Sequence, residues 1–429
     1  MGGHSWYWSY SNEDPAHEFP GNRISEWTGL LVSNQPTSDD VDFDWGHNPL
    51  MSPRNAIIAL NAHSDGDVTL DMQESGLISK CLSPLTSFVP YDYPGFWQSL
   101  HDFANQSGWS VIDVDSGHEF GLDPLDDVSI MIESGLVSIL PPALLPSHPS
   151  HLEFPGPVTP NAPRTETNLT FNSNQTGLPR EFGPANPQAM ILHSTGLYAP
   201  PGEPVTVVVP QELVDSGVSV QVGVHDDTLW HKSKIWRFPS IVRSYPIAET
   251  QFEVGNAFGG PIFLASPPDA PLGSTWAEFR GGVEAPIYQH GSTSFSEWQI
   301  IRNRSAPWAE ISSDQFIMSV PSSEIRGLDN PEELMDFWVE ALEMEHELYG
   351  FIPWPRIERA AFDIQISAGW MHSGYPFMAH LVSAQEAVDL EHMESEGSWG
   401  MFHELGHNQH WNPSRLPGTT QTTCNFASV

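Results

Sequence analysis

The segment GMFHELGHNQHW, at residues 400–411, constrains the fold more than any other part of the chain. It contains the pattern H-E-x-x-H, with His403 and His407 four positions apart. Residues i and i+4 lie on one face of an α-helix, so the two imidazoles reach a common metal ion only if this segment is helical. Glu404 is then placed to act as base and acid toward a water activated by zinc. The segment therefore predicts a helix that carries a Zn²⁺ site, with a third ligand further along the chain.

The alternative interpretation is two surface histidines one helical turn apart. Composition alone produces H-E-x-x-H in about one such chain in twenty. The segment HELYG at 346–350 is an internal control, because it also begins His-Glu-Leu but has glycine in place of the second histidine. Around His403 the preceding SWGMF supplies an apolar helix face, and Asn-Pro at 412–413 ends the helix, since a residue before proline avoids α geometry. This context favours the metal site.

Charge and hydropathy exclude several classes of partner. The 429 residues contain 16 Lys and Arg against 54 Asp and Glu, a net charge of −38. This shortage of basic residues argues against nucleic acid and anionic lipid surfaces as partners. No run of about 18 apolar residues occurs, so direct membrane insertion is not expected. The N-terminus has no recognisable secretory signal, and two cysteines make no disulfide framework, which together favour a cytoplasmic location or a peripheral one at the plasma membrane.

Composition changes along the chain and predicts its domains. Residues 34–189 are acidic and rich in Pro and Ser, which predicts a linker region with short helices. Residues 190–300 contain short β-branched runs such as VTVVVP and VSVQVGV between Pro and Gly turns, which predicts a β-sandwich domain. Residues 301–429 show helical spacing, most clearly over 330–351. The expected fold class is therefore α+β and multidomain.

The motif and its surroundings resemble the enhancin-like zinc metallopeptidase family, most closely its eukaryotic branch, the TRP-channel-associated factors. The resemblance rests on GMFHELGHNQ, on QISAGWMHSGYPFM at 365–378 and on TTQTTCNFASV at 419–429, with further agreement in STGLYAPPGEPVTV and IERAAFDIQIS. It implies that 301–429 is a mostly α, zincin-like peptidase domain with a Zn²⁺ cofactor. The implied substrates are proteins or glycoproteins, and the branch implies a membrane channel protein as a possible partner.

The resemblance also bears on the two ends of the chain. GGHSWYWSY and FPGNRI resemble the end of the amidotransferase-like domain of that branch, so residues 1–33 are expected to be a remnant of an α/β domain. The family continues with more helix beyond Val429, which implies that the peptidase domain is truncated and the chain a fragment.

The resemblance places the third metal ligand at a glutamate in a T-x-E-x-T-x-N stretch, and Gln421 stands there in this chain. A neutral amide oxygen is a poorer zinc ligand than a carboxylate and leaves the site one negative charge short. His372 and Tyr375 are candidates for the substrate cleft, with Tyr375 toward the oxyanion. A tight Gly-Tyr-Pro turn packed on the core is their alternative interpretation.

Two functions from different classes follow. An intact H-E-x-x-H favours a zinc metallopeptidase, whereas Gln421 favours a non-catalytic binding or regulatory protein of a membrane channel with a degenerate peptidase site. A carbohydrate-binding β-domain would require several of the 16 tryptophans to be exposed. His225, Asp226 and Asp227 follow a predicted strand and suggest either a cation site or a β-turn, and the turn is favoured.

Overall fold

The structure, a computed structural model, describes residues 49–428 except 87–88, 92, 94, 174–176, 269, 271, 351–353 and 412–417. It divides into two compact units, which comprise Met1–Val111 with His118–Pro141, and Ile112–Gly117 with Pro142–Val429. The predicted α/β remnant over residues 1–33 lies outside the described residues. Within the described part, no helix combines the length and the apolar character needed to cross a bilayer.

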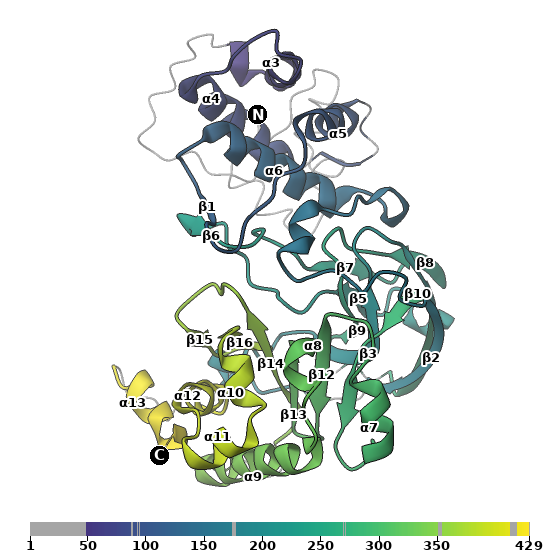
Figure 1. Cartoon of the computed structure of the whole chain (residues 1–429), viewed down its shortest axis with the longest axis vertical. Coiled ribbons are helices and arrows are strands. Elements are labelled where there is room, and N and C mark those ends of the chain that lie inside the picture. The colour runs from purple at the N-terminus through teal and green to yellow at the C-terminus, as the bar shows by residue number, and fades with distance from the viewer. Residues whose placement is uncertain are drawn as a thin grey trace. The chain divides into compact units, whose positions relative to one another are not determined.

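The first unit is helical, where the composition predicts a linker over 34–189. Its helices are α3 (Pro53–Ser64), α4 (Met72–Thr86), α5 (Phe96–Ser107) and α6 (Pro124–Ile139), with the short strand β1 (His118–Glu119) (Figure 1). Helix α6 begins at Asp123, whose side chain accepts hydrogen bonds from the backbone N–H groups of Leu125 and Asp126. Val128, Ile132 and Leu136, all from α6, are fully buried. The acidic and Pro/Ser-rich average over 34–189 conceals this core, because the apolar residues are concentrated on the helices.

The second unit begins with an eight-stranded sheet in the order β7-β5-β9-β3-β10-β4-β8, with β2 paired to β10. The long strand β10 pairs with β2 along most of its length, with β4 over Glu278–Arg280 and with β3 at its end, so it joins two halves of the sheet. Both halves contribute to a shared apolar core that includes Val205, Val220, Leu264 and Phe279. The sequence predicts a sandwich over 190–300; in the structure two groups of strands linked through β10 share one core, and the strands begin earlier, at Thr165. The strands of this sheet are β2 (Thr165–Asn172), β3 (Ile191–Ala199), β4 (Val205–Val208), β5 (Ser219–Val222), β7 (Arg243–Pro246), β8 (Gln251–Val254), β9 (Gly260–Ser266) and β10 (Ser274–Glu284), and the short strand β6 (Lys234–Ile235) lies outside it.

The C-terminal part is built on a six-stranded mixed sheet in the order β11-β12-β13-β14-β16-β15. The resemblance implies a mostly α domain and does not point to this sheet. Its strands are short, and longer helical stretches separate them. The strands are β11 (Ile287–Gln289), β12 (Trp308–Ser312), β13 (Phe316–Pro321), β14 (Glu358–Asp363), β15 (Met371–His372) and β16 (Phe377–His380). The helices are α7 (Phe295–Ile301), α8 (Ser322–Ile325), α9 (Pro331–Tyr349), α10 (Ser383–Ala387), α11 (Leu390–Ser395), α12 (Trp399–Asn408) and α13 (Thr420–Cys424), followed by the 3₁₀ turn η8 (Asn425–Ser428).

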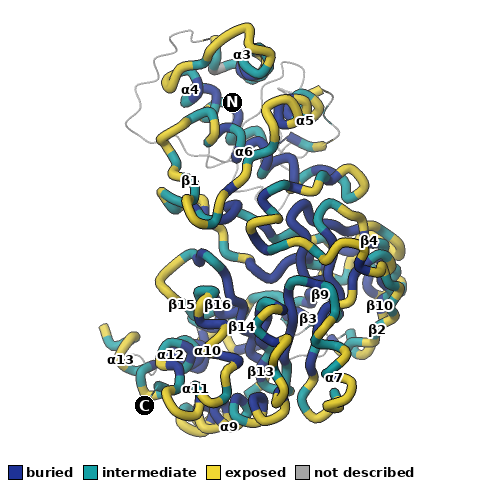
Figure 2. The backbone as a smooth tube through the Cα atoms, in the orientation of Figure 1, coloured by how far each residue is buried: buried dark blue, intermediate teal, exposed yellow. Residues whose placement is uncertain are grey.

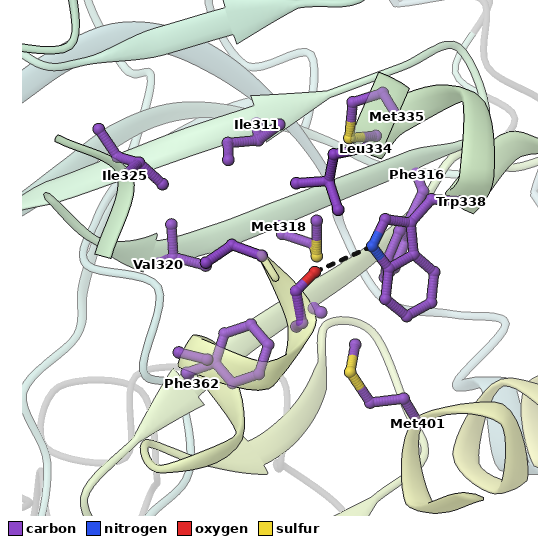
Figure 3. Close-up of a cluster of buried hydrophobic side chains, with 14 of the residues drawn as sticks. Ile311, Phe316, Met318, Val320, Ile325, Leu334, Met335, Trp338, Phe362 and Met401 are labelled. Carbon is purple, nitrogen blue, oxygen red and sulfur yellow. Dashed lines mark hydrogen bonds between the residues drawn. The ribbon is translucent and has the colours of Figure 1, made fainter. Parts of the chain in front are cut away.

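Helix α9 anchors this sheet and helix α12 to one core. It begins with Pro331 in its first turn and ends at Gly350, whose φ of 79° is the left-handed geometry that closes a helix. Its Trp338 is fully buried and donates from Nε1 to the backbone oxygen of Ala387, 3.1 Å away. Figure 3 shows Met401 of α12 pointing into the same cluster as Trp338 and Phe362 of β14. The core therefore fixes the position of α12.

Buried polar contacts connect the six-stranded sheet to the region of the eight-stranded sheet. Arg237, which precedes β7, donates from Nε to both carboxylate oxygens of Asp363 at the end of β14, at 2.9 and 3.0 Å. Both side chains are completely buried. Arg359 of β14 bonds to Glu310 and reaches back to Ser194 Oγ at 2.8 Å. Strands β9 and β14, one from each sheet, are buried along their whole length (Figure 2). Both sheets therefore belong to the buried interior of the unit that contains the H-E-x-x-H helix.

Candidate metal centre

Helix α12 confirms the helix expected at H-E-x-x-H. Its residues Met401 and Leu405 are fully buried in the core shared with α9. His403 and His407 lie on another face, 5% and 6% exposed, with ring centroids 4.7 Å apart. The indole of Trp399, one turn earlier, stacks on the His403 ring at 4.4 Å. The two imidazoles are therefore held side by side on a fixed helix, as the i, i+4 spacing predicts.

Helix α13 and the turn η8 pack directly against α12. Gly406, inside the motif, permits this approach, because a Cβ there would lie 2.8 Å from the backbone oxygen of Cys424 and 2.8 Å from Cβ of Ala427. As a result Gln421 Oε1 lies 2.9 Å from His403 Nε2 and 3.3 Å from His407 Nε2. The structure thus brings Gln421, the candidate third ligand, to both histidines.

Two further residues join the cluster that the sequence does not single out. Cys424 is fully buried, and its Sγ lies 3.5 Å from His403 Nε2 and 3.4 Å from His407 Nε2. Asn425 Oδ1 lies 2.6 Å from His403 Nδ1. Burial raises the pKa of the Cys424 thiol to about 11. The signal that points to Cys424 is its place three residues after Gln421, which puts both on one face of a short helix.

Glu404 faces a cleft beside the two histidines. The cleft has a volume of about 450 Å³, and its lining includes Glu404, His403, Trp370, Trp399 and Met371. Burial raises the pKa of Glu404 above its usual value, and nearby His403, the backbone of Ser373 and His372 act in the opposite direction. A carboxylate with a raised pKa next to two imidazoles is suited to accept a proton near neutral pH.

His372 and Tyr375, the candidates for the substrate cleft, have different surroundings. His372 is partly exposed, bonds through Nε2 to Asp227 Oδ2 at 2.8 Å and lies within electrostatic reach of Glu404. Tyr375 is only 5% exposed and packs in an apolar cluster, with the Arg356 guanidinium 4.5 Å from its ring. That placement matches the packed turn for Tyr375, while His372 remains a candidate cleft residue.

The predicted turn at 225–227 has a structural role. His225 is buried between Trp308 and Phe154, at ring distances of 4.3 and 4.8 Å. Asp227 accepts from the backbone N–H of Ser367 at 2.6 Å and bonds to His372. These contacts hold the loop after β14 against the eight-stranded sheet. They do not gather the three side chains at one point, so the structure does not favour a cation site there.

The donor atoms at α12 meet the requirements of zinc. Zinc bonds to nitrogen at about 2.0–2.1 Å and to sulfur at about 2.3 Å, so tetrahedral ligands lie roughly 3.3–3.6 Å apart. The groups able to bind a metal at His403, His407 and Cys424 all lie within 4.8 Å of one another. Asn425 also holds Nδ1 of His403, as the outer partners of zinc-binding histidines do. The residues present therefore fit the ion.

The chain is similar to known protein families and to curated proteins of several vertebrates. Residues 281–429 match the family model described as Peptidase M60, enhancin and enhancin-like, and residues 162–275 match the N-terminal domain of M60-like peptidases. TRPM8 channel-associated factor 2 of Bos taurus is 31% identical over 451 residues, which cover 100% of this chain and 46% of the relative. A TRPM8 channel-associated factor homolog of Xenopus laevis is 41% identical over 253 residues, which cover 58% of this chain and 28% of the relative.

The chain thus spans about half the length of the first of these curated relatives. Among solved structures, a functionally unknown conserved protein from Bacillus anthracis str. Ames superposes with a TM-score of 0.52 at 16% identity. That match covers 62% of this chain and 55% of the other. At this identity it supports the fold alone.

Proposed function

Because the chain belongs to the enhancin-like M60 peptidase family, we propose that it hydrolyses peptide bonds of proteins or glycoproteins with a zinc ion held on α12. One observation carries the proposal. His403 and His407 converge with Gln421 at 2.9 and 3.3 Å, and Glu404 of the same helix lines the adjacent cleft. The groups proposed to activate the nucleophile therefore lie next to the cleft proposed to admit the substrate.

Each residue of the centre has a distinct role in this proposal. When bound, zinc supplies a Lewis acid that polarises the peptide carbonyl and lowers the pKa of the attacking water. His403 and His407 would hold the ion, and Gln421 stands at the position of the third ligand. Glu404 accepts the proton of the nucleophile and returns it to the leaving amine, a task that its raised pKa favours. His372, held by Asp227, lies within electrostatic reach of Glu404 and adds positive charge near it when protonated.

The test separates catalysis from metal binding. We expect purified chain with zinc to cleave a panel of unmodified and O-glycosylated protein substrates, and Glu404→Ala to retain zinc while losing at least about 100-fold in rate, as removal of a general base does. Glu347→Ala is the matched control, since Glu347 follows His346 in the pseudo-motif on α9 and is exposed. Equal cleavage by wild type and Glu404→Ala would contradict the proposal.

A second candidate function is non-catalytic binding to a membrane channel protein. Two observations favour it: Gln421 replaces the expected carboxylate, and the curated relatives are named channel-associated factors. The measurement is binding of purified chain to solubilised TRPM8 by biolayer interferometry. Binding that survives Glu404→Ala, with no cleavage by the wild type, supports this function, whereas absence of binding eliminates it for this channel.

A further inference from the structure

Cys424 is the buried donor that the proposed function leaves unused. Its side chain is fully buried, and its sulfur lies 3.5 and 3.4 Å from Nε2 of His403 and His407. The separation from His407 matches the roughly 3.5 Å expected between nitrogen and sulfur ligands of one tetrahedral zinc ion. The sulfur is also 3.5 Å from Nδ1 of His403, so it packs against that ring and must turn toward Nε2 to share an ion with it. Gln421 Oε1, at 2.9 and 3.3 Å from the same nitrogens, lies on the same cluster.

The hydrogen bond to Asn425 shows which atoms carry electron pairs. His403 Nδ1 lies 2.6 Å from Asn425 Oδ1, so Nδ1 carries the proton and donates it. Nε2 of His403 then presents a lone pair, and Gln421 Oε1 faces it at 2.9 Å as a second acceptor. With Nδ1 hydrogen-bonded to Asn425, Nε2 is the ring nitrogen left to bind a metal ion, and it lies in the same cluster as Oε1 of Gln421 and the sulfur of Cys424.

Charge decides which atom is the third strong ligand. Two neutral imidazoles and an amide give zinc no negative partner, which leaves the site one charge short of a His₂-carboxylate set. A thiolate restores that charge, and sulfur is a softer and stronger zinc ligand than an amide oxygen. Thiolates also occur in catalytic zinc sites, so the substitution does not by itself exclude hydrolysis.

We propose that Cys424 is the third strong zinc ligand of this chain, with the Gln421 amide as the weak fourth donor. This inference rests on the proposed zinc site. On binding, the S–H bond of Cys424 breaks, its proton leaves to solvent, and the sulfur electron pair forms the bond to zinc. The amide oxygen of Gln421 would be the weakest of the four donors and so the easiest to exchange for an oxygen of water or substrate.

Cobalt substitution tests the ligand set without any assay of activity. Co²⁺ is added to metal-free wild type, Cys424→Ser, Gln421→Ala, His403→Ala and Cys81→Ser, the last removing the other cysteine of the chain. We expect a thiolate-to-cobalt charge-transfer band in wild type, Gln421→Ala and Cys81→Ser, and none in Cys424→Ser. In a parallel competition titration, Cys424→Ser weakens zinc binding by at least about 10–100-fold, and more than Gln421→Ala does.

The outcomes separate this inference from the proposed function. If wild type binds cobalt without a thiolate band, or if Cys424→Ser binds zinc as wild type does while His403→Ala does not, the thiolate assignment is wrong and the zinc site stands. If His403→Ala also binds as wild type does, the proposed function fails together with it. Wild type and Cys81→Ser decide the spectroscopic question even if Cys424→Ser fails to fold.

Discussion

The imidazole of His372, in β15, lies 2.8 Å from the carboxylate of Asp227, which follows the strand β5 of the other sheet. The backbone oxygen of Ser373 accepts from Nδ1 at 3.0 Å, so both ring nitrogens have acceptors. Asp227 in turn accepts from the backbone N–H of Ser367. These contacts hold His372 within electrostatic reach of Glu404 and connect β15 to the segment that follows β5.

We expect the pKa of His372 to lie above its usual value. Burial alone lowers that pKa, but the hydrogen bonds to Asp227 and Ser373 and the nearby carboxylates prevail. A raised folded-state pKa adds stability that is complete below about pH 6.5, the unfolded value, and is lost as pH rises through the folded value. An NMR titration of the His372 ring should show its pKa fall in Asp227→Asn. An unchanged pKa would show that Asp227 does not stabilise the protonated imidazole of His372.

His225 should make the protein less stable in mild acid. Burial lowers its pKa to about 4, so it stays neutral in the fold while the unfolded chain takes up a proton below about pH 6.5. Stability therefore decreases as pH falls through this window, by about 2 kcal/mol between pH 7 and pH 5 for one such histidine. Urea unfolding at both pH values should show a smaller loss in His225→Phe than in wild type. The same loss in both proteins would contradict the burial of a neutral His225.

Helical periodicity predicts the elements that carry most of the site, but not every ligand. Helices α9 and α12 were foreseeable because their apolar residues recur at 3.6-residue spacing within one segment. The six-stranded sheet was not, because strands such as β15 have only two residues and because β13 pairs with β14 across the whole length of α9. Cys424 and Asn425 were missed for a related reason. Only the return of the chain over Gly406 brings them to α12.

Asn425 should control metal affinity without touching the metal. Its Oδ1 accepts from Nδ1 of His403 at 2.6 Å and so directs Nε2 toward the other donors. We expect Asn425→Ala to weaken zinc binding by about 10-fold, while Asn425→Asp, which keeps an acceptor, binds at least as tightly as wild type. A competitive chelator titration measures both. Equal affinity in wild type and Asn425→Ala would mean that the hydrogen bond does not orient the imidazole.

Breaking the buried ion pair Arg237–Asp363 should strongly lower the free energy of unfolding. Asp363→Asn leaves the Arg237 guanidinium charged and buried without its partner, which costs about 3–5 kcal/mol. The matched control is Glu203→Gln, which breaks the exposed pair with Arg164 and should cost less than about 1 kcal/mol. Denaturant unfolding of the two variants provides the comparison. Similar losses in both would show that the buried pair contributes no more to stability than the exposed one.

Metal analysis of the purified chain tests the central claim most directly. Two imidazoles held 4.7 Å apart on a fixed helix, with a thiol and an amide oxygen beside them, should retain zinc through purification and dialysis. Mass spectrometry of the metal content should give about one zinc per wild-type chain, and far less for His403→Ala and His407→Ala, since each variant removes one of the two imidazole ligands. The account would be contradicted if wild type contained no zinc, or if both variants retained as much zinc as wild type. The peptidase fold would then serve only as a scaffold.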